Sequence, residues 1–399
     1  MSKQIQDAYI VAATRLPVAK RQGMYRHVRP DDMLARVIQG VLAQAPGLDP
    51  RRIGDVIVGC AMPEAEQGMN VARIGLLLAG LPDSVPGLTI NRFCASGLQA
   101  VADAANRIRL GEADVMIAAG TESMSVMPQI MGNKVAMNPA ILANAEHLGI
   151  AYGMGLTAEK VAQRWQVSRE DQDAFALASH QKACAAIAAG HFAAEITPHL
   201  VREQLPDLSS GAVRVREFTA EVDEGPRADA SPATLAKLRP VFHARGSVTA
   251  GNSSQMSDGA GAVLLVSEKV LKEFNLTPLA RFAGFAVRGV APDVMGIGPV
   301  AAIPEALAQA GIGASALDWI ELNEAFAAQS LAVIRALDLD PSRINPLGGA
   351  IALGHPLGAT GAIRTATVVH GLQRTGGRYG MVTMCIGTGM GAAGIFERL

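Results

Sequence analysis

Two stretches of this chain, CASGLQAVADAANRI at 94–108 and LGATGAIRTATVVHGL at 357–372, share one local pattern. In each, a turn of small residues opens a helix of amphipathic period. The first helix leads towards a strand that ends in AAGT at 118–121, and the second towards one that ends in CIGT at 385–388. Self-similarity of this kind within one chain favours two related halves.

Short apolar runs alternate with helical segments around both stretches, as in α/β proteins. The predicted strands are AYIVAA, DVIVGC, LTINRF, DVMIAAG, PLARFAGFAVRGV, WIELN and YGMVTMCI, and further predicted helices are AIPEALAQAG and AFAAQSLAVIRAL. Residues 124–250 differ, with Met-rich and Asn-rich loops, a helix at SREDQDAFALASHQKACAAIAAG and a long polar stretch. We therefore predict a first half at 1–123 plus 251–277, an insertion at 124–250 and a second half at 278–399.

Composition excludes several classes of function. The 35 Lys and Arg balance 36 Asp and Glu, so the net charge of −1 gives no general attraction to nucleic acid or to an anionic membrane. Hydrophobic residues make up 49% of the chain, but no apolar run is long enough to span a bilayer. The N-terminus lacks the pattern of an export leader, so we expect a cytoplasmic protein. The four cysteines have no CxxC spacing, so we expect neither disulfides nor a metal site.

The C-terminal stretch CIGTGMGAAGIFERL, residues 385–399, contains glycine patterns similar to dinucleotide-binding fingerprints. Such fingerprints work inside a βαβ unit, with an acidic residue about twenty positions further on. Only GIFERL follows the glycines, and we expect no room there for a helix, a second strand or that acidic residue. The glycines are better explained as allowing two backbone segments to approach closely, with peptide NH groups exposed beside Cys385.

Three cysteines lie before the C-terminal stretch, and Cys94 differs from the other two in its sequence context. Cys60 and Cys184 lie in apolar contexts typical of a cysteine that packs as a small hydrophobe. Cys94 follows a predicted strand and begins a helix, where unpaired NH groups and the helix dipole favour a thiolate. It is a candidate nucleophile, although small residues also occur at helix starts only to permit packing.

His355 and Asn323 complete a possible catalytic set. His355 stands in NPLGGAIALGHPLGATG, a glycine-rich loop ahead of a helix, and Asn323 stands in ELNEAFAAQ at the end of a predicted strand. A purely structural histidine remains an alternative. Two cysteines, a histidine and an asparagine in such settings point to covalent acyl chemistry.

The chain resembles the thiolase family over nearly its whole length. The similar stretches, in order, are NRFCASGLQA, GTESMS, MGLTAEKVA, LRPVF, VTAGNSSQMSDGA, MGIGP, ELNEAFAAQ, NPLGGAIALGHPLGATGA and CIGTGMGAA. The resemblance implies two similar α/β halves in an αβαβα sandwich, an inserted loop domain, and a dimer or tetramer. It also implies an acyltransferase that cleaves 3-ketoacyl-CoA, with coenzyme A as a substrate and no permanently bound cofactor or metal.

The resemblance assigns roles to five residues. Cys94 is the acylated nucleophile, His355 its base and an oxyanion donor, and Cys385 the acid/base at the α-carbon. Asn323 holds a water beside His355, and a second oxyanion hole uses the backbone NH groups of Cys94 and Gly387.

The resemblance also places five residues near the bound substrate. They are Ser254 at the pantetheine chain, Arg227 near the adenosine end, Met154 as a flexible apolar wall, and Phe242 and Phe326 as apolar walls. Core packing is an equally good explanation for the two phenylalanines.

Several alternatives stay open at this point. Biosynthetic acetoacetyl-CoA thiolases are similar to one another in a stretch YHMG, and Gly153 takes the place of its histidine in the stretch AYGMG. The missing histidine favours the degradative branch and a roomier acyl pocket. The biosynthetic enzyme is the runner-up, and a non-catalytic acyl-CoA binder is less favoured because the Cys, Asn, His, Cys set is intact. A condensing enzyme of fatty acid synthesis is a further alternative, but such enzymes are expected to have a Cys, His, His site, and here the third residue is Cys385. A complex with a multifunctional β-oxidation subunit is also possible.

Overall fold

The computed structural model describes residues 5–126 and 137–399. Strand β1 (Ala8–Arg15) lies between two sets of strands and pairs with a member of each. The strand order is β10-β11-β12-β9-β1-β8-β5-β3-β4, with the short strand β2 (Ala19–Lys20) beside β8. The first set contains β3 (Asp55–Gly59), β4 (Gly87–Ile90), β5 (Val115–Ser123) and β8 (Ser257–Ser267). The second contains β9 (Ala280–Gly289), β10 (Leu317–Leu322), β11 (Tyr379–Ile386) and β12 (Met390–Glu397).

The two sets repeat one topology. In the first, β3 runs parallel to β5, β5 antiparallel to β8, and β8 antiparallel to β1. In the second, β10 runs parallel to β11, β11 antiparallel to β12, and β12 antiparallel to β9. The predicted internal repeat is therefore present in the strand pairing.

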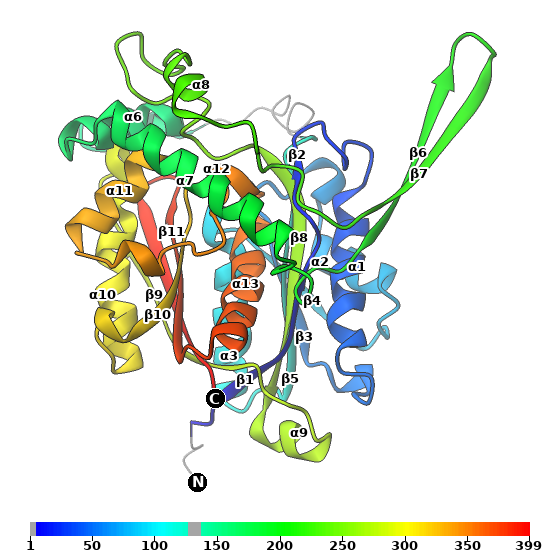
Figure 1. Ribbon diagram of the computed structural model, residues 1–399. Helices are drawn as coiled ribbons and strands as arrows, with labels where there is room; N and C mark the ends of the chain where they lie inside the picture. The colour runs from blue at the N-terminus through cyan, green and yellow to red at the C-terminus, as the bar shows by residue number, and fades with distance from the viewer. Residues whose placement is uncertain (1–4, 127–136) are drawn as a thin grey trace.

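Helices form three layers around the strands. Helices α3 (Ser96–Arg109) and α13 (Thr360–Thr375) pack on each other between the two sets. On the outer faces, α1 (Pro30–Ala43) packs on β8 and β5 beside α2 (Val71–Leu78), and α10 (Gly298–Ala310) packs on β9 and β12. Figure 1 shows α3 and α13 in the middle with these outer helices on either side. The predicted αβαβα arrangement is confirmed.

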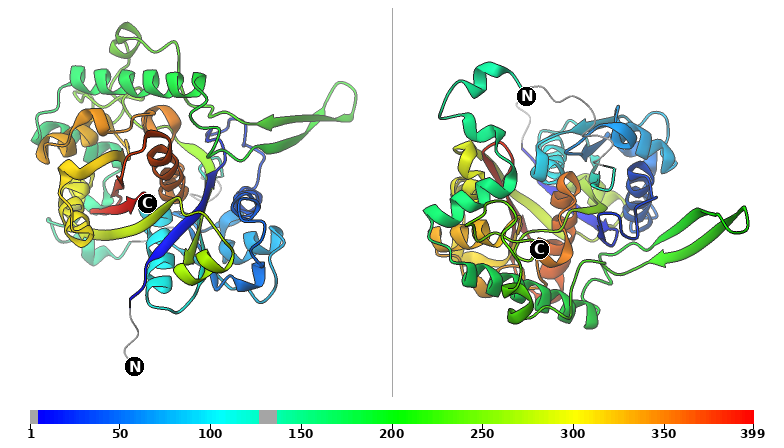
Figure 2. Two further views of the ribbon diagram at one scale, coloured as in Figure 1. Left: turned by 60° about the horizontal axis from the view of Figure 1, so that its bottom comes forward. Right: turned by 90° about the horizontal axis from the view of Figure 1, so that it is seen from above.

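The segment between β5 and β8 covers one end of these layers. It contains the helices α5 (Pro139–Leu142), α6 (Met154–Arg164), α7 (Arg169–Ala188) and α8 (Pro232–Ala236). A hairpin of β6 (His199–Asp207) and β7 (Ala212–Ala220) projects far from the body in Figures 1 and 2. The sequence analysis missed this hairpin, because most of its side chains are exposed and it lacks an apolar face. Residues 127–136 of the predicted insertion lie outside the described residues.

Three short helices lie between the other strands: α9 (Glu268–Glu273), α11 (Ala327–Ala336) and α12 (Ala350–Leu353). Within residues 5–126 and 137–399, no helix combines the length and the apolar character needed to cross a membrane.

The C-terminal glycines lie in a strand, which corrects one expectation. Residues 390–397 form β12, and Gly391 is opposite Cys385 of β11. The expectation that no second strand fits there is wrong, because the glycine-rich residues themselves form it. A Cβ atom at Gly391 would overlap the backbone of Gly298, so glycine lets β12 lie against the start of α10. The predicted close approach of backbone segments is confirmed.

A second close approach joins the two repeats at the centre. A Cβ atom at Gly361 would overlap the backbone of Leu98, and one at Gly97 would lie 2.7 Å from the amide nitrogen of Ala362. The starts of α3 and α13 therefore touch through glycine. The turns that precede these helices consequently lie side by side at one end of the central layer.

Candidate active site

A cavity of about 570 Å³ lies at the starts of α3 and α13, under the helices of the insertion. Its wall brings together Cys94, His355 and Cys385, which are far apart in the sequence. The remaining lining residues are Met124, Met154, Gly155, Val241, Phe242, Ala250, Ser253, Ser254, Gln255, Met256, Met295, Ala325, Phe326 and Leu357. The described lining contains no Lys, Arg, Asp or Glu, so two thiols and an imidazole are its most reactive groups.

Cys94 lies in a turn ahead of α3, and several hydrogen bonds hold the backbone of this turn in place. The 3-10 turn Phe93–Ala95 follows β4, and Phe93 has a φ of 44°, which is unfavourable for a bulky residue. The side chain of Asn91 accepts a hydrogen bond from the Phe93 amide at 2.8 Å. Ser96 donates its hydroxyl proton to the Phe93 carbonyl at 2.7 Å and accepts from the Arg92 amide at 2.8 Å. Strain held by such contacts is typical of functional sites.

The thiol of Cys94 is protonated at rest. Burial raises the pKa of Cys94 to about 11, while hydrogen bonds from the backbone NH groups of Gly387 and of Cys94 itself lower it. The backbone NH groups at the helix start do favour the thiolate, as expected, but the cost of desolvation is larger and leaves the pKa raised. A base must remove the proton when Cys94 reacts. The same two NH groups are those predicted for the second oxyanion hole.

His355 is oriented through both ring nitrogens. Its Nδ1 lies 2.6 Å from the Thr360 hydroxyl, and its Nε2 lies 3.3 Å from the Asn323 amide nitrogen. Burial, with a smaller contribution from Arg364, lowers the pKa of His355 to about 3. The imidazole is therefore neutral at physiological pH and able to accept a proton. The sequence analysis missed Thr360, although a hydroxyl residue directly after the histidine turn was a visible signal.

Asn323 lies between β10 and α11, with its side chain buried beside His355. Its Oδ1 is buried and has no hydrogen-bond partner among the described residues. A buried amide oxygen without a partner is costly unless a ligand or a water pairs with it. The position fits the predicted role of holding a water beside His355.

Cys385 ends β11 on the other side of the cavity. It is fully buried, and burial, followed by the nearby Cys94, raises its pKa above the ordinary value of a thiol. Thr388 and Gly389 in the turn after it both have positive φ values, 73° and 95°. The turn brings the Gly387 amide to the Cys94 sulfur. A thiol kept neutral in this way suits proton transfer better than nucleophilic attack.

Two buried glutamates that the sequence analysis missed hold the loops of the site. Glu324 accepts hydrogen bonds from Ser179, Asn345 and the Ile351 amide, and thereby fixes α12 ahead of His355. Glu122 accepts from the amides of Ala61, Met62 and Gly358, and so joins the two halves below the cavity. Glutamate in the motifs TES and NEAF was visible in the sequence, but its partners come from distant segments.

The predicted wall residues line the cavity. Phe242 and Phe326 meet edge to face with ring centroids 6.1 Å apart, and Met154 lines the same cavity. Ser254 lies in the wall beside them and donates its amide to the Ala325 carbonyl at 2.9 Å. Three further methionines, Met124, Met256 and Met295, were missed because sequence spacing does not bring them together.

Gly153 is not itself a lining residue of the cavity, but it directly precedes the lining residues Met154 and Gly155. It precedes α6, is exposed, and a Cβ atom built on it meets no atom within 4 Å.

Arg227 lies outside the cavity, in an adjoining pocket of about 360 Å³. This pocket also contains Lys20 and His180, and Ala250 and Gln255 belong to both linings. Arg227 is mostly exposed and forms an ion pair with Asp229 at 3.2 Å. A ligand that extends from the reaction cavity past Gln255 would reach these cations.

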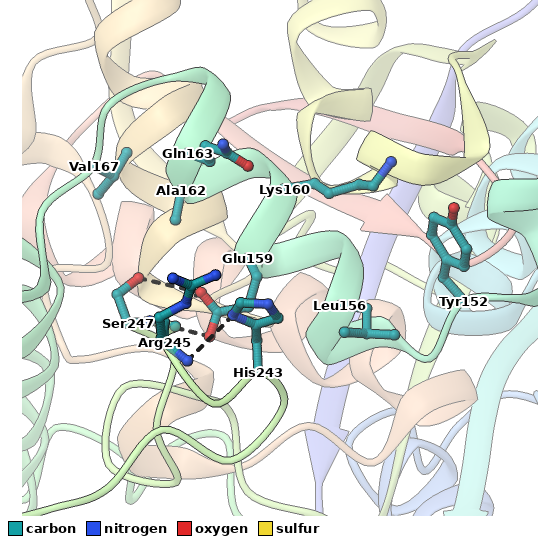
Figure 3. A pocket seen from close by; sticks show the side chains of 11 residues that line it. Tyr152, Leu156, Glu159, Lys160, Ala162, Gln163, Val167, His243, Arg245 and Ser247 are labelled. Atoms are coloured by element: carbon teal, nitrogen blue, oxygen red, sulfur yellow. Dashed lines mark hydrogen bonds between the residues drawn. The ribbon is translucent and has the colours of Figure 1, made fainter.

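A third hollow, of about 650 Å³, lies along the outer side of α6. Figure 3 shows Glu159 pointing from α6 to the turn at 245–247, with Leu156 and Lys160 on the same helix and Tyr152 on the segment before it. The Glu159 carboxylate accepts hydrogen bonds from the amides of Ser247 and Val248. No cysteine lines this hollow, so we assign the reaction to the smaller cavity. Glu159 supports the loop that carries Phe242 in the wall of that cavity.

Comparison with known proteins gives matches over nearly the whole chain. Residues 8–269 match the family "Thiolase, N-terminal domain" and residues 276–398 match "Thiolase, C-terminal domain". A relative from Bacillus subtilis (strain 168), described as 3-ketoacyl-CoA thiolase, is 48% identical over 98% of this chain and 100% of its own.

Two solved structures share the fold over 100% of both chains. The crystal structure of the Bacillus anthracis acetyl-CoA acetyltransferase has a TM-score of 0.90 at 38% identity. The crystal structure of human mitochondrial 3-ketoacyl-CoA thiolase has a TM-score of 0.87 at 39% identity.

Proposed function

Because this chain belongs to the thiolase family of acyltransferases, we propose that it cleaves 3-ketoacyl-CoA with coenzyme A, giving acetyl-CoA and a shortened acyl-CoA. One observation carries the proposal: Cys94, His355 and Cys385 line a single apolar cavity in which the histidine is neutral. The 48% identity to a 3-ketoacyl-CoA thiolase supports the same substrate class.

The first half-reaction uses both cysteines. His355 accepts the Cys94 proton as the sulfur attacks the 3-keto carbon, since a thiol with a pKa of about 11 supplies little thiolate alone. The bond between C2 and C3 then breaks, and its electron pair passes to the acetyl-CoA enolate. Cys385 donates its thiol proton to C2, and acetyl-CoA leaves. The shortened acyl group remains on Cys94 as a thioester.

The second half-reaction returns the enzyme to its starting state. The Cys385 thiolate takes the proton of an incoming CoA thiol, and the CoA sulfur attacks the acyl carbon on Cys94. The Cys94 sulfur leaves and recovers its proton from His355. Acyl transfer in two such steps is a ping-pong mechanism.

Two groups of donors stabilise the negative charge that forms on oxygen. The donors at one negatively charged oxygen are the imidazolium of His355 and a water held by Asn323. The backbone NH groups of Gly387 and Cys94 already converge on the Cys94 sulfur and supply the other. Preoriented donors of this kind act strongly in a site that excludes water.

The pantetheine chain of CoA would follow the wall past Ser254 to Gln255, and its nucleotide would reach the Arg227 pocket. Shared lining at Gln255 and Ala250 supports this path, and Lys20 and Arg227 supply positive charge for phosphates.

The four methionines and two phenylalanines of the wall support substrates longer than four carbons, as in β-oxidation. A biosynthetic acetyl-CoA acetyltransferase is the second candidate, because a structure so described has the same fold at 38% identity. Thiolysis rates for 3-ketoacyl-CoA chains of 4, 6, 8 and 12 carbons separate the two. Each buried methylene contributes about 0.8 kcal/mol, up to roughly fourfold in kcat/KM. Activity confined to four carbons would favour the biosynthetic enzyme, and no covalent acyl enzyme at all would favour a binding protein.

We further propose a cytoplasmic homodimer or homotetramer. Strand β4 is one of the two edge strands of the described sheet, and exposed apolar side chains lie beside it: Met69 at 93% exposure, Leu78 at 51% and Leu77 at 43%. An unpaired edge with apolar neighbours is a pairing site for a second copy. Sedimentation velocity tests this, and a monomer at micromolar concentration would contradict it. Co-purification with a multifunctional β-oxidation subunit would test for a further partner.

A further inference from the structure

Glu321 and Arg364 form a buried ion pair behind the residues that orient His355. Arg364 Nη1 lies 3.5 Å from Glu321 Oε2, and the two side chains are 4% and 1% exposed. The Trp319 indole NH donates to the other carboxylate oxygen at 2.7 Å. Neither charged residue lines the reaction cavity. Because a buried ion pair adds little net stability once desolvation is counted, its place beside a reactive site points to another role.

Both members of the pair adjoin a residue that contacts His355. Glu321 stands two positions before Asn323, whose amide still donates to a carbonyl of β11 at 2.9 Å. The strand geometry therefore continues, and the Glu321 and Asn323 side chains lie on the same face. Arg364 stands four positions after Thr360 on α13 and shares its helix face. The ion pair thus lies one strand step and one helical turn away from the two groups that bond to the imidazole.

The elements packed around Glu321 carry further charged groups. They come from β1, the segment before β6, the end of β10 and α13, and are Arg15, Glu195, Glu324 and Arg374. Glu195 is paired with Arg15 at 2.6 Å, and Glu324 accepts hydrogen bonds from neutral groups. Arg374 lies over the Trp319 ring. The β11 side chains in the central core are apolar. Arg364 is therefore the cation that balances Glu321.

The charge balance of this pair acts on His355. Arg364 lowers the pKa of His355, in addition to the larger effect of burial. Burial raises the pKa of Glu321 to about 7, while Arg364 and the Trp319 NH lower it. The carboxylate is therefore charged above pH 7, where it offsets the guanidinium, and neutral below pH 7, where Arg364 is left uncompensated. An uncompensated cation disfavours the imidazolium that forms when Cys94 gives up its proton.

We propose that Glu321 and Arg364 are positioning residues for His355, in which the Glu321 carboxylate offsets the Arg364 charge and so lets the imidazole accept the Cys94 proton. The inference rests on the proposed thiolase function. The proton passes from the Cys94 sulfur to the ring and returns at the end of the cycle, so the pair itself is unchanged. Removing the carboxylate alone should slow acylation, whereas removing both charges together should not.

The test follows acylation of Cys94 by acetyl-CoA in quenched single turnovers, analysed by mass spectrometry from about pH 5.5 to 8.5. In the parent, the rate should rise about tenfold with an apparent pKa near 7, because the pKa values of His355 and Cys94, about 3 and about 11, lie outside this range. Glu321→Gln should lose this rise. At pH 8 it should be about tenfold to a hundredfold slower than the parent, since a nearby charge shifts a pKa by about one to three units.

Two further variants distinguish charge balance from packing. The double variant Glu321→Gln, Arg364→Met carries neither charge, so it should recover most of the parental rate and show no rise near pH 7. Arg364→Met alone should stay within about threefold of the parent at pH 7, because the pKa of Glu321 rises when its cation is lost and the carboxyl becomes neutral. A pair that served only for packing would be slowed by either change.

Asp55→Asn is the matched control. Asp55 of β3 pairs with Arg107 of α3 at 2.6 Å, which is likewise an ion pair between a strand and a helix, but in the first half of the chain. This variant should keep the parental pH profile of acylation even where its Tm falls. A changed profile in Asp55→Asn would show that any lost ion pair has the effect, and would overturn the inference.

The outcomes separate this inference from the proposed function. A parent that forms no acyl enzyme with acetyl-CoA or acetoacetyl-CoA would overturn the thiolase proposal itself. A parent that is acylated at a constant rate across the pH range would overturn only the inference, and so would a double variant as slow as Glu321→Gln. If Glu321→Gln fails to fold, the double variant decides, because neutral residues of similar volume leave no buried charge unpaired. Persistence of the rise near pH 7 in that variant would contradict the role of Glu321, and its loss would support it.

Discussion

The turns that open α3 and α13 occupy equivalent places in the two halves but hold different chemical groups. Cys94-Ala95-Ser96-Gly97 corresponds to Gly358-Ala359-Thr360-Gly361. In the first turn, the Ser96 hydroxyl bonds to the backbone of Arg92 and Phe93. In the second, the Thr360 hydroxyl bonds to the His355 ring, and the Gly358 amide bonds to Glu122.

The difference indicates how a repeated scaffold becomes asymmetric. Both turns keep the glycine that lets the helices touch, so both deliver their groups to one point. The hydroxyl that shapes the backbone in the nucleophile turn orients a base in the other. Variants of these two turns should therefore fail in different ways.

Removing the nucleophile tests the first turn most severely. Cys94→Ala should lower thiolysis by on the order of 10⁶-fold, because no other group can form the thioester. Incubation with acetoacetyl-CoA, digestion and mass spectrometry should place the acyl mass on Cys94 in the parent and nowhere in the variant. A label on Cys385 would reverse the roles of the two cysteines.

Removing the second thiol should separate acylation from proton transfer. Cys385→Ala should still accept an acetyl group from acetyl-CoA on Cys94, whose base and oxyanion donors are intact. Thiolysis and α-proton exchange should fall by about 10²- to 10⁴-fold, the range of general acid–base contributions. Hydrogen–deuterium exchange at the acetyl methyl group measures the second effect. Equal loss of acylation in this variant would contradict the division of labour.

Thr360 tests the second turn through the orientation of His355. Thr360→Val keeps the shape but removes the hydroxyl, so the ring loses its partner at Nδ1. We expect kcat to fall about tenfold to a hundredfold with little change in KM, as for other residues that orient a functional histidine. Thr360→Ser should restore most of the rate. Loss of thermal stability without a change in kcat would show that the hydroxyl is only structural.

The layered fold was predictable because the repeat, the buried strands and the amphipathic helices are all local patterns. Cys94, His355, Cys385 and Asn323 were also predictable, since each stands in a turn or at the end of a strand beside one, and the family resemblance joins them. The hairpin of β6 and β7 was not, because its alternating exposed side chains carry no core signal.

Two properties of the site depend on tertiary structure and were out of reach. The pKa of Cys94 is raised mainly by desolvation, which the sequence does not specify and which outweighs the effect of the helix start. The partners of Glu122 and Glu324 lie in segments up to 236 residues away.

The loss of folding stability at acid pH should depend on His355 and not on Cys94. The folded pKa of His355 is about 3 and its ordinary value is 6.5, so only the unfolded chain takes up this proton between those values. The free energy of unfolding should therefore decrease as the pH falls from 6.5 towards 3, while the full contribution is present above 6.5. His355→Asn should flatten the dependence of Tm on pH in this window. Cys94→Ala should keep the parental slope, because Cys94 stays neutral throughout it, and a flattened slope there would contradict the assignment.

The smallest expected effect comes from Ser96, the counterpart of Thr360. Ser96→Ala leaves the Arg92 amide and the Phe93 carbonyl without their hydroxyl partner, in a turn that already holds Phe93 at a φ of 44°. The loss should lower the free energy of unfolding by about 1 to 2 kcal/mol in urea titrations. Acylation should slow less than about tenfold, because Asn91 still holds the turn and His355 keeps both of its partners. The two hydroxyls would then differ as the structure implies, one acting mainly on stability and the other mainly on rate. A loss of rate in Ser96→Ala as large as in Thr360→Val, with unchanged stability, would break that contrast.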